Sequence, residues 1–74
     1  MTNRFYASNP SIERIFNSIQ AQNGGVVRRD ANSVRRFASI ADLETAVRIR
    51  GFHLIRNGNQ LVIFCNKADL QIIL

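Results

Sequence analysis

Few side chains in this sequence could do covalent or metal chemistry. His53 and Cys65 are the only histidine and the only cysteine, and a structural zinc site needs four ligands of these kinds. No carboxylate or serine stands at a spacing from His53 that indicates a catalytic pair. Cys65 ends an apolar stretch, which favours a buried and inert thiol. We therefore expect no enzyme activity, no metal and no cofactor.

Arginine is the residue type that could act at a site. Ten basic residues stand against five acidic ones, which gives a net charge of +5 and a pI near 11.2, and nine of the ten are arginine. Such a domain attracts polyanions, and the planar guanidinium donates two parallel hydrogen bonds to phosphate or guanine. Three interpretations fit this charge: nucleic acid, an acidic protein partner, or solubility alone. We favour nucleic acid, and DNA over RNA.

The arginines are not evenly distributed. The triplet Val-Arg-Arg occurs at 27–29 and again at 34–36, so four arginines fall within nine residues. A second polar group surrounds the turn at 56–60. Together with one arginine of a predicted helix these give the candidate nucleic-acid-binding residues: Arg28, Arg29, Arg35, Arg36, Arg48, Arg56, Asn57, Asn59 and Gln60.

The first element that must position these residues is a helix. Asn9 can cap it and Pro10 suits its first position, where no backbone N–H is needed. Apolar residues then follow at helical spacing: Ile12, Ile15, Phe16 and Ile19. The helix should stop at the Asn-Gly-Gly of 23–25. Residues 1–9 form an N-terminal arm, and 10–74 form one globular domain.

The segment 26–38 has three interpretations. Val26 and Val27 are β-branched and favour a strand, whereas the residues after Asp30 show helical spacing. We prefer a short strand at 26–28 followed by a short helix at 31–37. A single helix and a hairpin remain alternatives.

A longer helix and a hairpin follow. Ser39 and Asp42 resemble a capping box, and Gly51 should end a helix over 40–50. The stretch GFHLIRNGNQLVIF predicts strands at 52–56 and 61–65 joined by a turn at Asn57-Gly58-Asn59. Residues 70–74, LQIIL, predict a last strand that pairs in the core or with another copy of the chain.

These elements make a small α+β domain, with two to three helices packed on an antiparallel sheet of two to four strands. The order α-β-α-α-β-β-(β) resembles a winged-helix domain. The resemblance implies that 40–50 is the recognition helix and that the turn at 56–60 is the wing. It also implies that the protein is a small DNA-binding regulator or accessory factor. Asp42 and Glu44 on the front of that helix would repel phosphate, which favours non-specific or wing-led binding.

The hairpin also resembles HicA-type toxins, small ribonucleases with a pattern near G-F-x-L-x-R-x-x-G-S-H. Gly51, Phe52, Leu54 and Arg56 match this pattern loosely, and Gly58 is taken as the glycine before Ser-His, one residue early. Asn59-Gln60 stands where the family has Ser-His, so the general base is missing. This resemblance implies a non-catalytic RNA-binding relative, an alternative beside a protein-interaction module that binds an acidic partner.

Size and composition complete the expectations. A core of 74 residues supplies only about 3–5 kcal/mol unaided, which favours a homodimer through the C-terminal strand 70–74. A single cysteine fits a reducing compartment. No apolar run approaches the roughly 20 residues of a membrane span. We expect a soluble, cytoplasmic protein with no membrane partner.

Overall fold

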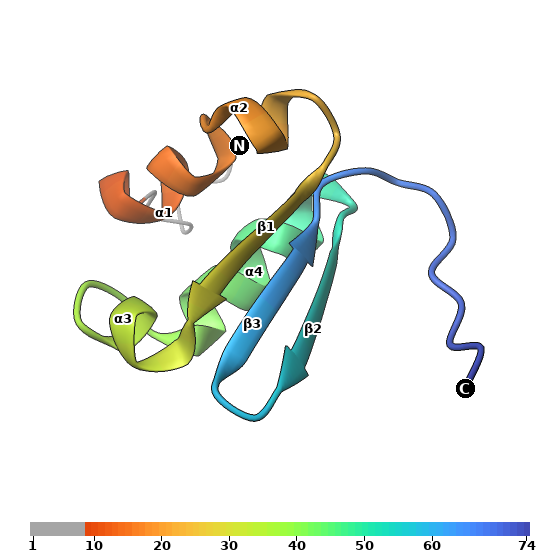
Figure 1. The fold of residues 1–74 in the computed structure, drawn as a ribbon. Coiled ribbons are helices and arrows are strands. Elements are labelled where there is room, and N and C mark those ends of the chain that lie inside the picture. Colours follow the sequence, from red (N-terminus) through yellow and green to blue (C-terminus); the bar gives the residue numbers. More distant parts are fainter. Residues whose placement is uncertain (1–8) are drawn as a thin grey trace.

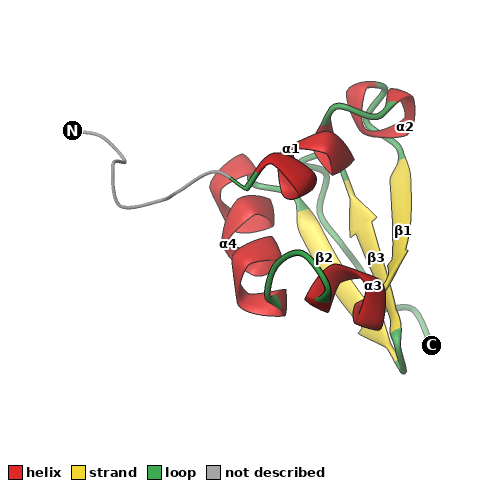
Figure 2. Cartoon of the chain, turned by 90° about the vertical axis from the view of Figure 1, so that its left-hand side faces the viewer, coloured by secondary structure: helices red, strands yellow, loops and turns green. Residues whose placement is uncertain are grey.

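The structure, a computed structural model, describes residues 9–74 and shows a small α+β domain. Its elements in chain order are α1 (Pro10–Phe16), α2 (Ile19–Gln22), β1 (Val26–Asp30), α3 (Ala31–Arg35), α4 (Ile40–Arg50), β2 (His53–Asn57) and β3 (Gln60–Phe64). The helices lie on one side of an antiparallel sheet (Figure 1 and Figure 2). Apart from Asn9, the predicted N-terminal arm 1–9 lies outside the described residues.

The sheet has the order β1-β3-β2, so β3 is central and pairs with both neighbours. Side chains alternate between its two faces. Val27, Leu61 and Ile63 point toward the helices and are at most 4% exposed. The opposite face, here called the outer face, carries four apolar residues that no described helix covers: Val26, Ile55, Val62 and Phe64.

The core lies between the sheet and the helices, and every helix contributes to it. α4 provides Leu43, Ala46 and Val47, while α1 provides Ile12, Ile15 and Phe16. These are helical spacings, so each helix turns one apolar stripe to the sheet. In the sequence, the helical spacing of Ile40, Leu43, Ala46 and Val47 predicts the buried face of 40–50; the last three are buried and Ile40 is partly buried beside them.

The predicted hairpin is confirmed, with strands displaced by one residue. Asn57 pairs with Gln60, so the loop is the two-residue turn Gly58-Asn59. Gly58 has φ +60°, and no other residue type among those described has positive φ. Glycine at the first turn position is the requirement of a type II′ turn, whose twist matches that of the strands.

The first helix was predicted as one element and the structure breaks it in two. Ser18 starts α2: its hydroxyl accepts from Ala21 N at 3.3 Å and donates to Ile15 O at 2.8 Å. This new cap changes the direction of the chain, so the 3.6-residue period does not continue across it. Ile19, predicted in the buried stripe, is 77% exposed.

Of the three interpretations of 26–38, strand followed by helix is confirmed. β1 runs to Asp30, two residues further than predicted, because every residue of Val26–Asp30 has a partner on β3. Asp30 then caps α3 by accepting from Ser33 N at 3.2 Å. The helix is shorter than predicted and ends at Arg35.

The capping box of α4 is confirmed. The Ser39 hydroxyl accepts from Asp42 N at 3.0 Å, and the Asp42 carboxylate accepts from Ser39 N at 3.3 Å. Gly51 ends the helix with φ +74°, a left-handed conformation that favours glycine. No helix within residues 9–74 is long and apolar enough to cross a membrane.

The predicted last strand is wrong for the single chain. Residues 70–74 form neither strand nor helix and are exposed. A strand needs a neighbour that pairs with its backbone, and this segment passes beside the sheet without pairing. The observed order is α-α-β-α-α-β-β, compared with the predicted α-β-α-α-β-β-(β).

Candidate nucleic-acid interface

Most of the predicted site residues meet at one end of the sheet. There the β2–β3 turn lies against the junction of β1 and α3, and Ala31 N donates to Asn59 O at 2.7 Å. We call this region the hairpin end. It contains eight of the predicted residues: Arg28, Arg29, Arg35, Arg36, Arg56, Asn57, Asn59 and Gln60.

The strands place three of the arginines on different faces. Arg28 lies opposite Val62 on the outer face, where its side chain is exposed. Arg29 and Arg56 both lie opposite Leu61, one on each side of it, on the face toward the helices. Neighbouring strands are about 4.8 Å apart, so these two arginines start roughly 10 Å apart across β3. The basic surface thus extends around the end of the sheet.

Local hydrogen bonds hold two of these side chains against the backbone. The Arg29 guanidinium donates to Arg28 O at 2.7 Å, and Arg56 Nε donates to Gly58 O at 2.8 Å. Each guanidinium carries five N–H donors, so most of its donors stay available to a ligand. The turn therefore orients Arg56 while leaving its outer N–H groups able to donate.

α3 adds two more exposed arginines. Arg35 donates to Asn32 Oδ1 at 2.9 Å, one turn earlier, and Arg36 is the C-cap of the helix. α3 begins directly after β1, so the chain carries these two arginines away from the strand by about one and a half helical turns. The first Val-Arg-Arg triplet lies on β1, and the second lies at the end of α3 and its C-cap.

A shallow depression marks the centre of the hairpin end. It has a volume of about 200 Å³ and is lined by Arg28, Arg29, Asp30 and Gln60. A water molecule occupies about 30 Å³ in the liquid, so this space accommodates a group the size of a phosphate. Asp30 was not among the candidate residues named from the sequence, and it lines this depression as well.

The charge at the hairpin end is not neutralised within the described residues. Their two ion pairs are Arg48–Glu44 at 3.2 Å and Arg50–Glu13 at 2.8 Å, both elsewhere. The five arginines of the hairpin end face one carboxylate there, Asp30, at more than ion-pair distance. Exposed like charges repel one another, and a bound polyanion relieves that repulsion.

Arg48, the ninth predicted residue, lies apart from the others. It is in the last turn of α4, near the start of β2 and so at the opposite end of the sheet from the turn. Its partner Glu44 is one helical turn away, and both side chains are more than half exposed. The structure thus gives Arg48 a local pairing on the helix surface.

The exposed face of α4 has the opposite character from the hairpin end. Asp42 and Glu44 are exposed there, and Arg48 is paired with Glu44. Asp42 belongs to the capping box, so its carboxylate serves the helix N-terminus. This face presents no excess of positive charge to a phosphate backbone.

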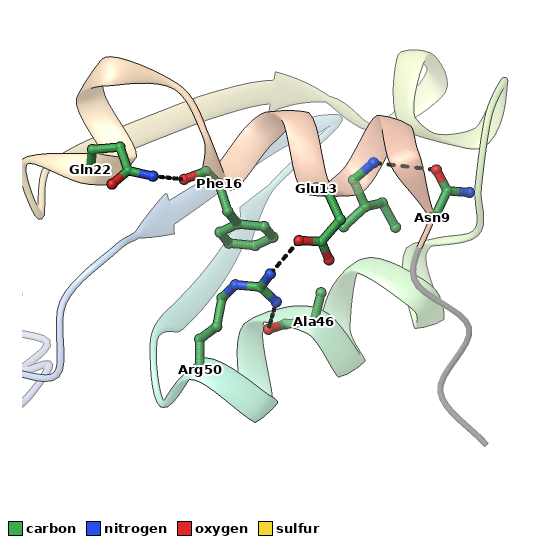
Figure 3. A network of polar contacts seen from close by, with 7 residues as sticks. Asn9, Glu13, Phe16, Gln22, Ala46 and Arg50 are labelled. Carbon is green, nitrogen blue, oxygen red and sulfur yellow. Dashed lines mark hydrogen bonds and ion pairs between the residues drawn. The ribbon is translucent and has the colours of Figure 1, made fainter. Parts of the chain in front are cut away.

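A second hollow, of about 400 Å³, lies at the other end of the molecule, where Arg50 joins α4 to α1. The Arg50 guanidinium donates to Glu13 Oε1 at 2.8 Å and to Ala46 O at 3.0 Å (Figure 3). It also lies over the Phe16 ring, 4.1 Å from the centroid. From the sequence, Arg50 falls in the last turn of the predicted helix 40–50, where a cation complements the helix dipole. Its contacts give it a structural role.

Cys65 also borders the second hollow. The thiol is 3% exposed, and burial raises its pKa, partly offset by the positive charge of Arg50. A protonated, buried thiol is a poor nucleophile. Within residues 9–74, no three His, Cys, Asp or Glu side chains gather in a way that could hold a metal ion.

The chain was compared with protein-family models, with curated proteins and with solved structures, and no match was found in any of the three.

Proposed function

We propose that this protein binds nucleic acid, DNA in preference to RNA, through the hairpin end. The observation that carries the proposal is the group of five arginines that make no ion pair with a described residue. Exposed guanidinium groups with available donors suit phosphate oxygens, which accept two parallel hydrogen bonds. Binding releases the counterions of the phosphates, and this release supplies most of the affinity.

The polar residues of the turn support nucleic acid over an acidic protein. Asn57, Asn59 and Gln60 are exposed at the tip beside the arginines. Amide side chains donate and accept at once, which suits sugar, phosphate and base edges. A protein partner that offered only carboxylates would use the arginines and leave the acceptor oxygens of these amides without a role.

The same arrangement supports a binding mode led by the wing of a winged-helix-like domain. In this proposal the turn acts as the wing, and α3 begins beside it, where Ala31 N donates to Asn59 O. α4, the counterpart of a recognition helix, exposes Asp42 and Glu44. We infer that the contact runs along the phosphate backbone and carries little sequence preference.

The test compares two triple variants of equal charge. The first changes Arg28, Arg35 and Arg56 to alanine, and its control changes Arg14, Arg48 and Lys67, which are exposed basic residues outside the hairpin end. Fluorescence anisotropy measures the affinity for a generic DNA duplex, single-stranded DNA and duplex RNA over a series of salt concentrations. Circular dichroism verifies that both variants are folded.

The expected result is a selective loss in the first variant. The slope of log K against log salt should fall by up to about 2.7, since each lost phosphate contact is worth about 0.9. The control should retain most of the slope, because the net charge alone does not make a contact. Equal losses in both variants, or no binding of the wild type at low salt, would overturn the proposal; tighter binding to RNA would overturn its preference for DNA.

A further inference from the structure

Residues 70–74 expose more apolar surface than any other segment that the structure describes. The exposed fractions are Leu70 41%, Ile72 74%, Ile73 87% and Leu74 114%. Burying such side chains is the main favourable contribution to association. A segment of this composition lying in solvent indicates a surface that it is built to meet.

The chain just before this segment is held in place. His53 Nε2 lies 2.6 Å from Ala68 O, and Asn66 Nδ2 donates to Gly24 O at 3.1 Å. Asn66 Oδ1 also accepts from Ala68 N at 3.0 Å, which closes a local turn. These bonds fix where the apolar segment leaves the domain, and it runs away from the core on the β2 side of the sheet (Figure 1).

β2 offers an open sheet edge on that side. The two-residue turn makes Asn57 and Gln60 a hydrogen-bonded pair, and such pairs alternate along an antiparallel ladder. The backbone N–H and C=O groups of Leu54 and Arg56 therefore point away from β3. Neither residue makes a backbone hydrogen bond on that side with any described residue.

The other edge of the sheet is less suitable. By the same alternation Val26, Arg28 and Asp30 point their backbone groups outward from β1. Arg28 O already accepts from the Arg29 guanidinium, and Asp30 caps α3. β1 also carries three charged side chains, Arg28, Arg29 and Asp30, against Arg56 alone on β2, and charged side chains on an edge discourage the addition of a strand. β2 is the edge that a further strand fits.

We propose that residues 70–74 of one copy add as a strand to the β2 edge of a second copy, and that the exchange is reciprocal about a twofold axis. Leu70, Ile72 and Leu74 would then share one face, because strand side chains alternate. That face continues the apolar outer face at Ile55 and Phe64. This proposal does not depend on the proposed function.

We assign the added strand to a second copy of the chain because each chain has both the apolar segment 70–74 and an open β2 edge, and the two do not pair with each other within one chain. Its own segment stays exposed, and its own edge at Leu54 and Arg56 stays open. A self-complementary surface closes with twofold symmetry, the commonest symmetry of small assemblies. Strand addition supplies backbone hydrogen bonds as well as apolar burial, so a five-residue segment suffices for recognition.

Light scattering coupled to size exclusion tests the assembly. The wild type should show twice the 8.4 kDa chain mass. Ile72→Asp, and separately Ile72→Pro, should reduce this to one chain mass, since one places a charge on the contact and the other removes a backbone donor. Ile19→Asp changes another exposed apolar residue, outside the segment, and should stay dimeric. A monomeric wild type, or a dimer unaffected by both Ile72 changes, would overturn the proposal.

A cysteine pair identifies the occupant. Chains with Cys65→Ala and Ile55→Cys are mixed with chains that carry Cys65→Ala and Ile72→Cys, because Ile55 and Ile72 share the outer face in the proposed arrangement, and the mixture is mildly oxidised. A disulfide that links the two kinds of chain supports the exchange. If the two new cysteines are placed in one chain and give only a product of single-chain mass, the segment pairs with its own β2, and the second copy is refuted.

Discussion

Two arginines of α4 allow a direct test of what burial does to an ion pair. Arg48 and Arg50 are two residues apart, and each pairs with a glutamate. The Arg48–Glu44 side chains are 70% and 56% exposed, whereas those of Arg50 and Glu13 are 25% and 32% exposed. We expect Arg50→Ala to destabilise the protein far more than Arg48→Ala.

The magnitudes follow from the contacts. An exposed i,i+4 pair contributes about 0.3–0.5 kcal/mol, which is the expected cost of Arg48→Ala. Arg50 adds a hydrogen bond to Ala46 O, stacking on Phe16 and a tie between α1 and α4. Stacking of this kind is worth about 0.5–2 kcal/mol, so we expect a total loss of about 2–3 kcal/mol. In a domain of this size that lowers Tm by roughly 10–20 °C.

Urea titration and thermal melts of both variants measure the difference. Arg50→Lys is a useful third variant, because it keeps the charge and loses the planar fork and its stacking. It should fall between the wild type and Arg50→Ala. If Arg50→Ala and Arg48→Ala have the same free energy of unfolding within 0.5 kcal/mol, roughly the error of such titrations, the assignment of Arg50 to the core structure is wrong.

Three further predictions concern stability. Asn9→Ala should cost about 1 kcal/mol in a urea titration, because Asn9 Oδ1 caps α1 at Ser11 N and Ile12 N; Asn9→Asp should recover most of it. Gly51→Ala should also cost about 1 kcal/mol, since φ is +74°, and Gly51→Asn should cost less. Burial raises the pKa of Cys65, so the folded state holds the thiol proton more tightly. The contribution of the protonated thiol to the free energy of unfolding should be complete below the ordinary thiol pKa of about 8.5 and should decline as the pH rises above it. Urea titrations from neutral to alkaline pH should show this decline in the wild type and not in Cys65→Ala.

The elements that local chemistry determines were predictable from the sequence. The capping box of α4, its glycine stop and the turn at Gly58-Asn59 each depend on neighbouring residues alone. The break after α1 was missed although Ser18 is a good cap residue. Its hydroxyl could cap a new helix or point to solvent in a continuous one, and the residue type does not decide between them.

Long-range pairing limited the remaining predictions. β1 runs to Asp30 because β3 offers it partners, and the sequence of β1 does not contain that information. Residues 70–74 have strong β propensity and still form no strand, because propensity describes a fit to neighbours that this chain does not place beside them. The fold class was accessible from local patterns, whereas the ends of the strands depended on tertiary contacts.

The candidate site shows the same division. The two Val-Arg-Arg triplets are close in the sequence in all three interpretations of 26–38, and the structure places the first on β1 and the second at the end of α3. The sequence did contain a signal that separates Arg48 from them: Glu44 and Arg48 are four residues apart on the predicted helix 40–50, a spacing that favours an ion pair. Arg50 was assigned to the helix dipole, and its contact with Phe16 crosses 34 positions of the chain.

The hairpin connects the two proposals, and one variant can separate them. Arg56 points its side chain to the basic surface while its backbone lies on the open edge of β2. Arg35 belongs only to the basic surface, and Ile72 only to the exchanged segment. If a dimer binds one duplex with both hairpin ends, Ile72→Asp should lower the salt slope of DNA binding to about half while leaving a folded monomer. If each copy binds alone, Ile72→Asp should leave the slope per chain unchanged, and only Arg35→Ala should reduce it. Anisotropy and light scattering on the same Ile72→Asp samples decide between the two binding modes. A lower salt slope that accompanies the change from dimer to monomer mass indicates binding by the dimer, and an unchanged slope indicates binding by each chain alone.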